Sequence, residues 1–98
     1  MAELRFEWDL RKDAANRRKH GVSFEEARSV FADDHAWLLD DAEHSATEDR
    51  YILLGLSDRF RVVVVVHTYR RHDEVIRIIS ARPATRRERR QYDERWLT

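Results

Sequence analysis

Arginines offer the most direct chemistry in this 98-residue sequence, and they concentrate near its C-terminus. Arg82 directly follows a predicted strand, so a rigid sheet can aim its guanidinium. Arg86 and Arg90 follow at intervals of four residues, and Arg89 adjoins them. Because a guanidinium binds phosphate through parallel hydrogen bonds, the segment predicts a phosphate-contacting surface with Arg82 as its clamp. The alternative is an Arg82 that only forms an ion pair with Glu88 or a neighbouring acid.

Two pairs of residues have side chains that can move protons. His67 and Tyr69 lie two positions apart on a predicted strand and therefore share one face. With an unperturbed pKa near 6.5, His67 is a candidate general acid or base, and Tyr69 is a candidate proton donor or base-stacking ring. Lys19 and His20 end a predicted helix and could supply a cation and a proton shuttle. The alternatives are a structural histidine at the end of an apolar strand and plain complementarity to the helix dipole.

Arg77 lies between two isoleucines of a predicted strand, so it must form an ion pair, lie at an edge or be functional. Whether it faces His67 depends on the hairpin register. A four-residue loop, Arg70 to Asp73, places Arg77 on the opposite face from His67, and a shift of one residue reverses this. The sequence is compatible with both.

The remaining candidates have strong structural alternatives. Tyr92 and Trp96 could stack on nucleic-acid bases, or they could form the buried stripe of a helix. Glu88 could act as a base or pair with an arginine. The two histidines and the acids between residues 33 and 44 match no defensible metal-site spacing, and the sequence has neither a phosphate-binding glycine loop nor a nucleophile elbow. We therefore expect no metal and no cofactor.

The net charge of zero conceals a segregation of charge along the chain. Residues 11–24 carry five bases and one acid, or +4; residues 25–59 carry ten acids and three arginines, or −7. Residues 70–98 carry nine arginines and five acids, again +4. This pattern favours a polyanion on one surface and a basic partner on another, unless the clusters cancel once folded.

Length and composition predict one folded domain over residues 1–98. The absence of cysteine excludes disulfides, and the N-terminus has no apolar signal-peptide core. The longest apolar run, Val62 to Val66, is far shorter than the ~20 residues of a membrane helix. We expect a soluble, cytoplasmic protein without membrane association.

Hydrophobic periodicity predicts an α+β fold. A short strand is expected at 5–8. It precedes a helix over 10–20, which is capped by Asp9 and ended by Gly21. A second helix begins at Ser23, in a capping box with Glu26. Further strands are expected at 37–39, 51–56, 60–69 and 75–80, with a polar loop at 40–48 and a final helix over 84–96. Because Val62 to Val66 is apolar throughout, that strand should be central in an antiparallel meander of about four strands, with two N-terminal helices and one C-terminal helix packed on it.

Short motifs recur in a characteristic order along nearly the whole chain: Phe6-Glu7-Trp8-Asp9, Asn16, Lys19-His20-Gly21-Val22, Ser23-Phe24-Glu25-Glu26-Ala27, Val30-Phe31, Arg77-Ile78-Ile79-Ser80-Ala81-Arg82, and Glu88-Arg89 with Tyr92. In this order they resemble the BrnT toxin family. The sequence departs from the family in a longer, glycine-free turn at 70–73 and in Pro83, where a basic residue is frequent.

The resemblance implies a RelE-like fold and a metal-independent endoribonuclease. It also implies a BrnA-type antitoxin that neutralises the toxin and carries most of the operator DNA binding of the complex. Metal-free RNA cleavage needs a base, an acid and cations around the phosphate. The catalytic candidates are Arg82, Arg77, His67, Tyr69, Lys19 and His20, and the RNA-binding candidates are Arg86, Arg89, Arg90 and Tyr92.

Two other functions remain open from the residues. The same arginines could grip DNA or RNA without cutting it, as a non-catalytic binding module. The chain could also be mainly an antitoxin-binding scaffold. Whichever of these functions holds, the charge of the acidic stretch Asp33 to Asp49 predicts a docking surface for a basic segment of the antitoxin.

Overall fold

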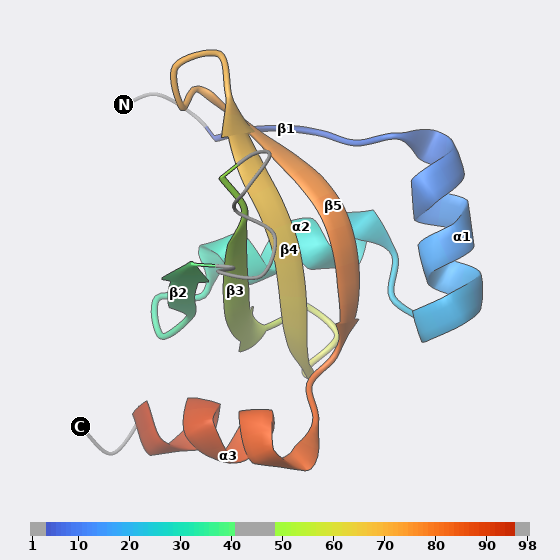
Figure 1. Cartoon of the computed structure of the whole chain (residues 1–98). Coiled ribbons are helices and arrows are strands. Elements are labelled where there is room, and N and C mark those ends of the chain that lie inside the picture. Colours follow the sequence, from blue (N-terminus) through green and yellow to red (C-terminus); the bar gives the residue numbers. More distant parts are fainter. Residues whose placement is uncertain (1–3, 41–48, 96–98) are drawn as a thin grey trace.

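A computed structural model describes residues 4–40 and 49–95 (Figure 1). Its elements follow the order β1 (Arg5–Glu7), α1 (Leu10–His20), α2 (Phe24–Ser29), the 3-10 turn η1 (Val30–Ala32), β2 (Trp37–Asp40), β3 (Tyr51–Leu56), β4 (Val62–Arg70), β5 (Val75–Pro83) and α3 (Arg86–Arg95). The expected α+β class is therefore confirmed. No helix in the described part of the chain is long and apolar enough to cross a membrane.

In the described part of the chain the sheet has five strands, in the order β1-β5-β4-β3-β2, where about four were expected. Strands β2 to β5 form the antiparallel meander, with β4 in the middle as predicted. The additional strand is β1, which pairs parallel with β5 through Glu7 and Arg77 among others. Sequence periodicity identified β1 as a strand but carried no signal for a partner some 70 positions away.

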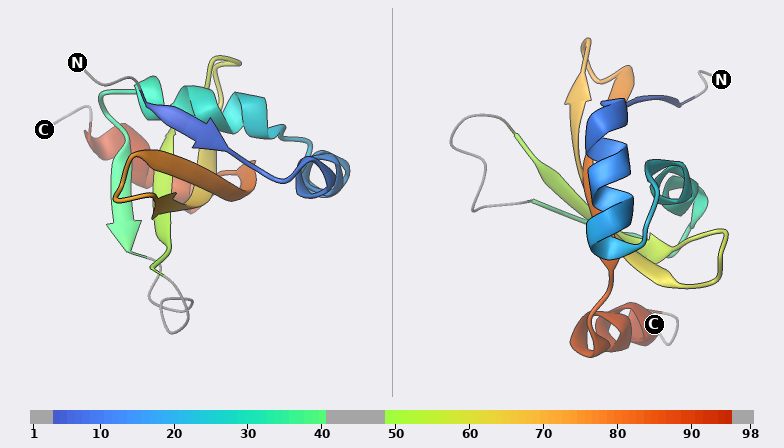
Figure 2. Two further views of the ribbon diagram at one scale, coloured as in Figure 1. Left: turned by 90° about the horizontal axis from the view of Figure 1, so that it is seen from above. Right: turned by 90° about the vertical axis from the view of Figure 1, so that its right-hand side faces the viewer.

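Helix α1 lies along the β5 edge of the sheet and not on a face of it, which corrects the predicted helix arrangement (Figure 2). Strand β1 pairs only with residues 75–77 of β5. Farther along β5, the side-chain amide of Asn16 makes the backbone hydrogen bonds that a neighbouring strand would make. Its Nδ2 donates to the carbonyl of Ala81 at 2.7 Å, and its Oδ1 accepts from the Ala81 N–H at 3.1 Å. One side chain thereby pairs the exposed backbone of β5 and fixes α1 beside it.

The α2 face of the sheet carries the larger core. Phe24, Ala27 and Val30 are fully buried against Val63 and Val65 of β4, as the helical spacing predicted. The caps also form as expected. Asp9 accepts two backbone N–H groups at the start of α1, and Gly21 ends that helix in the left-handed region at φ 71°. Ser23 Oγ accepts from the Glu26 N–H at 3.0 Å.

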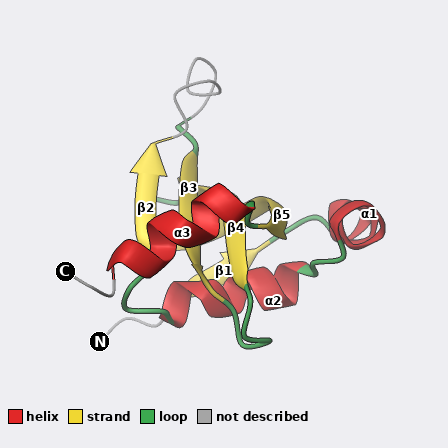
Figure 3. Cartoon of the chain, turned by 90° about the horizontal axis from the view of Figure 1, so that it is seen from below, coloured by secondary structure: helices red, strands yellow, loops and turns green. Residues whose placement is uncertain are grey.

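The opposite face is covered by α3, which crosses the ends of β2, β3 and β4 (Figure 3). Tyr92 packs there with Leu54 and Val64, so β4 is buried on both faces. The helix begins at Arg86 and not at residue 84, because Pro83 still belongs to β5 and the Ala84 N–H donates to the Val62 carbonyl at 2.9 Å.

The β4–β5 hairpin has an irregular register. Tyr69 pairs with Ile76 and Arg77 with Thr68, so Arg77 and His67 lie on opposite faces. Between Val66 and His67 the pairing shifts by one residue, which leaves one extra residue in β5. The turn at its tip holds Arg71, His72 and Asp73 at positive φ.

Candidate nucleic-acid interface

Basic residues from four segments lie at one end of the sheet. The segments are the end of α1, the β3–β4 turn, the end of β5 and α3. The Ala84 backbone joins the α3 entry to β4, and the Arg61 side chain joins the β3–β4 turn to the end of α1 by donating to the Gly21 carbonyl at 2.7 Å. Exposed cations of α1, including Lys19, thus lie at the same end of the molecule as the arginines of α3.

Arg82 is held in a bidentate ion pair with Glu88. Its Nη1 and Nη2 donate to the two carboxylate oxygens at 2.7 and 2.9 Å. The guanidinium beside it lowers the pKa of Glu88 to about 2, and the carboxylate in turn raises the pKa of Arg82. The Arg82 side chain stays 42% exposed, so the remaining N–H groups of the fork can face a ligand.

Glu88 is itself fixed by a capping box at the start of α3. Its Oε1 accepts from the Thr85 N–H at 2.8 Å, and Thr85 Oγ1 accepts from the Glu88 N–H at 3.1 Å. The structure therefore realises the ion-pair alternative for Glu88, and the same contact is the ion pair that was weighed against a phosphate clamp for Arg82. The pair holds Arg82 beside the N-terminus of α3. The positive end of the helix dipole lies there and favours a bound anion such as a phosphate group.

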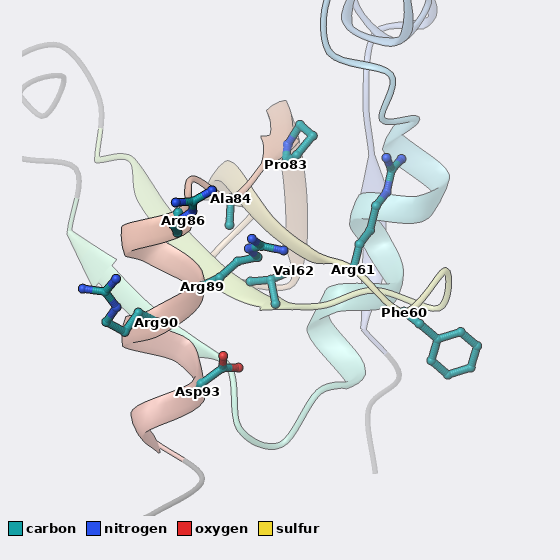
Figure 4. A pocket seen from close by; sticks show the side chains of 9 residues that line it. All are labelled: Phe60, Arg61, Val62, Pro83, Ala84, Arg86, Arg89, Arg90 and Asp93. Atoms are coloured by element: carbon teal, nitrogen blue, oxygen red, sulfur yellow. The ribbon is translucent and has the colours of Figure 1, made fainter.

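A groove of about 640 Å³ separates α3 from the β3–β4 turn. Arg86, Arg89, Arg90 and Asp93 line its helix side, at spacings that place them on one stripe of α3. Figure 4 shows Arg89 reaching into the space between helix and turn. We call this the α3 groove. Its composition fits the predicted RNA-binding role of the three arginines.

Arg82 and the α3 groove lie on different sides of the helix. Two residues of an α-helix span a rotation of about 200°, so Glu88 lies about 160° around the axis from Arg86. The arginine held by Glu88 and the arginines of the groove are therefore two separate groups of cations.

Arg77 lies on the same sheet face as Arg82, although the two are five positions apart, an odd interval that puts residues of a regular strand on opposite faces. Arg82 pairs with Val64 and Arg77 with Thr68, two positions of equal parity on β4. Five strand residues place the two arginines roughly 16 Å apart. Arg77 Nη1 donates to Glu7 Oε2 at 2.6 Å, and this bond is the main reason the pKa of Glu7 is lowered.

His67 and Tyr69 lie away from these arginines, on the α2 face of the sheet. His67 is completely buried, with its ring 4.8 Å from the ring of Phe31. Its Nε2 is 3.3 Å from the Tyr69 hydroxyl, and burial lowers the pKa of His67 to about 4. Burial also raises the pKa of Tyr69. A neutral, enclosed imidazole fits the structural alternative, and the six catalytic candidates do not form one cluster.

Tyr92 is also buried, and only 2% of it is exposed. Its hydroxyl donates to Asp33 Oδ2 at 2.6 Å, which ties α3 to the segment after η1. Burial tends to raise the pKa of Asp33, but hydrogen bonds from the Leu56 N–H, Tyr92 and the His35 N–H outweigh it, and the pKa is lowered. The Tyr92 ring is therefore part of the hydrophobic core, and we do not include Tyr92 in the proposed RNA-contacting surface. Its possible partner Trp96 lies outside the described residues.

Sequence reasoning missed Arg61 and Phe60 of the β3–β4 turn, which also line the α3 groove. Arg61 Nε and Nη2 donate to Glu26 at 2.7 and 2.6 Å. The Ser23 half of the predicted capping box forms, whereas the Glu26 carboxylate pairs with Arg61 and not with the start of its own helix. The only signal in the sequence was the turn itself, between two β-rich runs.

Within residues 4–40 and 49–95, no three histidines or carboxylates come together as a metal-holding group. His44 and the acids at 41–48 that were considered for such a site lie outside the described residues.

The described fold and its arginine-rich end define a small α+β domain suited to contact a polyanion. Residues 8–88 match the family model described as the ribonuclease toxin BrnT of type II toxin-antitoxin systems. The chain therefore belongs to the BrnT family of ribonuclease toxins. A 1.1 Å crystal structure of the Brucella abortus ribonuclease toxin BrnT has the same fold, with a TM-score of 0.65 and 21% sequence identity over 86% of this chain and 100% of that one. No curated protein sequence matches the chain.

Proposed function

We propose that the protein is a metal-independent endoribonuclease that inhibits translation by cleaving RNA and uses Arg82 as its phosphate clamp. The observation that carries this proposal is the Arg82–Glu88 pair. It holds a half-exposed guanidinium at the end of β5 and at the N-terminus of α3. Family membership supplies the ribonuclease activity, and the pair supplies a preorganised cation for it.

In such a reaction the 2′-oxygen attacks the adjacent phosphorus and the bond from phosphorus to the 5′-oxygen breaks. Negative charge builds on the non-bridging oxygens, and Arg82 donates hydrogen bonds to them. Arg77 contacts the same strand of RNA farther along the sheet face, since roughly 16 Å spans more than one nucleotide.

The proton that leaves the 2′-hydroxyl and the proton that reaches the 5′-oxygen require separate groups. Lys19 and His20 remain candidates because α1 ends at the same end of the molecule as Arg82. His67 is withdrawn from this role, because its ring is fully buried and its pKa is near 4. Tyr69 lies on the same α2 face of the sheet as His67, and we assign it a structural role in packing against the His67 ring.

The α3 groove holds the RNA chain electrostatically. Within residues 4–40 and 49–95, Arg86, Arg89 and Arg90 have no ion pair like the one between Arg82 and Glu88. They lie on a side of the helix remote from Arg82. Their contribution is to affinity and to its dependence on salt.

A type II toxin has an antitoxin partner, and we propose that here it is of the BrnA type and carries the operator binding of the complex. We also place this toxin in the RelE-like superfamily and in the cytoplasm. Among the acids predicted to meet the antitoxin, Asp33 is engaged internally, whereas Asp34 is exposed. The nearby edge strand β2 exposes Leu38 and Leu39 by 53% and 45%, which suits a partner segment lying along it. Residues 41–48 of the predicted surface lie outside the described residues.

Incubation of purified RNA with the protein in excess EDTA separates catalysis from binding. The proposal expects cleavage in EDTA at the rate measured with Mg²⁺. Intact RNA that is retained with a steep salt dependence would instead establish the non-catalytic binding module.

A further inference from the structure

The β3–β4 turn presents an aromatic ring to solvent at the rim of the α3 groove. Phe60 is 86% exposed, and its backbone lies in the left-handed region at φ 61°. A bulky residue rarely adopts that conformation, and it persists only where the surrounding structure imposes it. Figure 4 shows the ring projecting from the turn, away from α3 and outward.

The turn beneath Phe60 is firmly built. The Phe60 N–H donates to the Ser57 carbonyl at 3.0 Å, and the Ser57 N–H donates to the Arg61 carbonyl at 2.9 Å. Ser57 Oγ and the Arg61 guanidinium both donate to Glu26, which is only 4% exposed. The Asp58 N–H is fixed by Ser29 Oγ at 2.9 Å. The ring therefore stands on a preorganised support that loses little entropy when a ligand binds.

Isolated exposed hydrophobic residues are common, so the surroundings of Phe60 decide its significance. The helix side of the same groove carries three arginines, Arg86, Arg89 and Arg90, and one acid, Asp93. Arg61 of the turn also lines the groove, but its guanidinium is already paired with Glu26. Cations beside a free aromatic face match single-stranded nucleic acid, in which phosphates alternate with bases that stack on any aromatic ring.

We propose that Phe60 is a base-stacking residue for single-stranded RNA whose phosphates lie along the α3 groove. This inference rests on the proposed ribonuclease function and deepens it, because it makes the groove a site for unpaired RNA. A protein partner would also meet this surface, but the excess of arginine over acid along the groove favours a polyanion.

The test measures affinity for two uncleavable probes of equal length. One is a 2′-O-methylated single-stranded RNA, which lacks the attacking hydroxyl, and the other is a fully abasic strand with the same phosphates. Phe60→Leu keeps apolar bulk without a ring, and Phe60→Asn suits a positive φ and preserves the turn. Leu10→Ala, which alters a side chain in α1 with 77% exposure, is the matched control.

Both Phe60 variants should bind the base-containing probe roughly tenfold more weakly, within the range measured for base–aromatic stacking. They should bind the abasic probe as the wild type does, and the salt dependence should not change. Unchanged affinity for the first probe, or equal losses on both probes, overturns the inference.

Failure of this inference is distinguishable from failure of the ribonuclease proposal. If the wild type neither binds nor cleaves RNA, the proposed function is wrong, and the stacking role is wrong with it. If the wild type cleaves RNA and the Phe60 variants bind both probes normally, only the stacking role is wrong. Phe60 variants that bind RNA normally but lose affinity for the antitoxin would assign the ring to the protein partner and overturn the RNA role.

Discussion

Arg77 and Arg82 lie on the same face of β5 because one extra residue interrupts the pairing of that strand between them. In a regular strand, two residues five positions apart point to opposite faces of the sheet. The bulge therefore places two cations of the proposed site on one surface, with one of them paired to Glu7 and the other to Glu88.

Arg77 is expected to act on RNA as well as on Glu7, and a pair of substitutions separates these roles. Arg77→Met removes the guanidinium and should slow cleavage about tenfold, which corresponds to about 1.4 kcal/mol. Glu7→Gln breaks the same ion pair but keeps the cation, so its cleavage rate should stay within about twofold of the wild type. Equal slowing in single-turnover assays of both variants would assign Arg77 to the ion pair alone.

The α3 groove is expected to govern the salt dependence of RNA binding. Arg89→Gln should weaken binding of a single-stranded RNA and reduce the slope of log affinity against log salt by about 0.7, the value for one lost phosphate contact. Cleavage of saturating RNA should change little. The measurement is a titration at several salt concentrations, and a slope equal to that of the wild type would remove Arg89 from the interface.

His67 should make the fold sensitive to acid. Burial lowers its pKa to about 4, whereas an unfolded histidine titrates near 6.5. Between these pH values the unfolded chain binds more protons, so stability falls as the pH is lowered from about 6.5 to 4 and this contribution then levels off. From pH 7 to pH 5 the loss should be about 2 kcal/mol.

Urea unfolding of the wild type and of His67→Phe at pH 7 and pH 5 checks this expectation. The phenylalanine variant should lack the loss, whereas His72→Gln, which alters an exposed turn residue, should keep it. Carboxylates with lowered pKa, such as Glu26 and Glu88, lose their contribution only below about pH 4.5 and so do not confuse the comparison. An identical pH dependence in wild type and His67→Phe would contradict the buried, neutral imidazole.

Local signals in the sequence predicted much of the fold. Asp9, Gly21 and Ser23 act at helix ends through contacts within a few residues, and all three do so as expected. The uninterrupted apolar run from Val62 to Val66 correctly indicated a strand covered on both faces.

Long-range relationships could not be read in the same way. The pairing of β1 with β5, the Tyr92–Asp33 hydrogen bond and the capture of Glu26 by Arg61 each join residues tens of positions apart. A bulge is equally invisible, because it changes the parity of a strand without a glycine or proline to mark it. His67 and Arg82 were both catalytic candidates from the sequence, and the structure places them on opposite faces of the sheet.

Single-turnover cleavage of purified RNA in excess EDTA by the wild type, Arg82→Ala and Arg87→Ala tests the account most directly. Arg87 is an exposed arginine of the same helix that is not among the lining residues of the α3 groove, so it controls for the loss of one positive charge. The account predicts cleavage by the wild type, a loss of at least about 100-fold in Arg82→Ala, and a rate within about threefold of wild type in Arg87→Ala. A folded Arg82→Ala protein that cleaves as fast as the wild type, or a wild type that cleaves only when Mg²⁺ is restored, would contradict it.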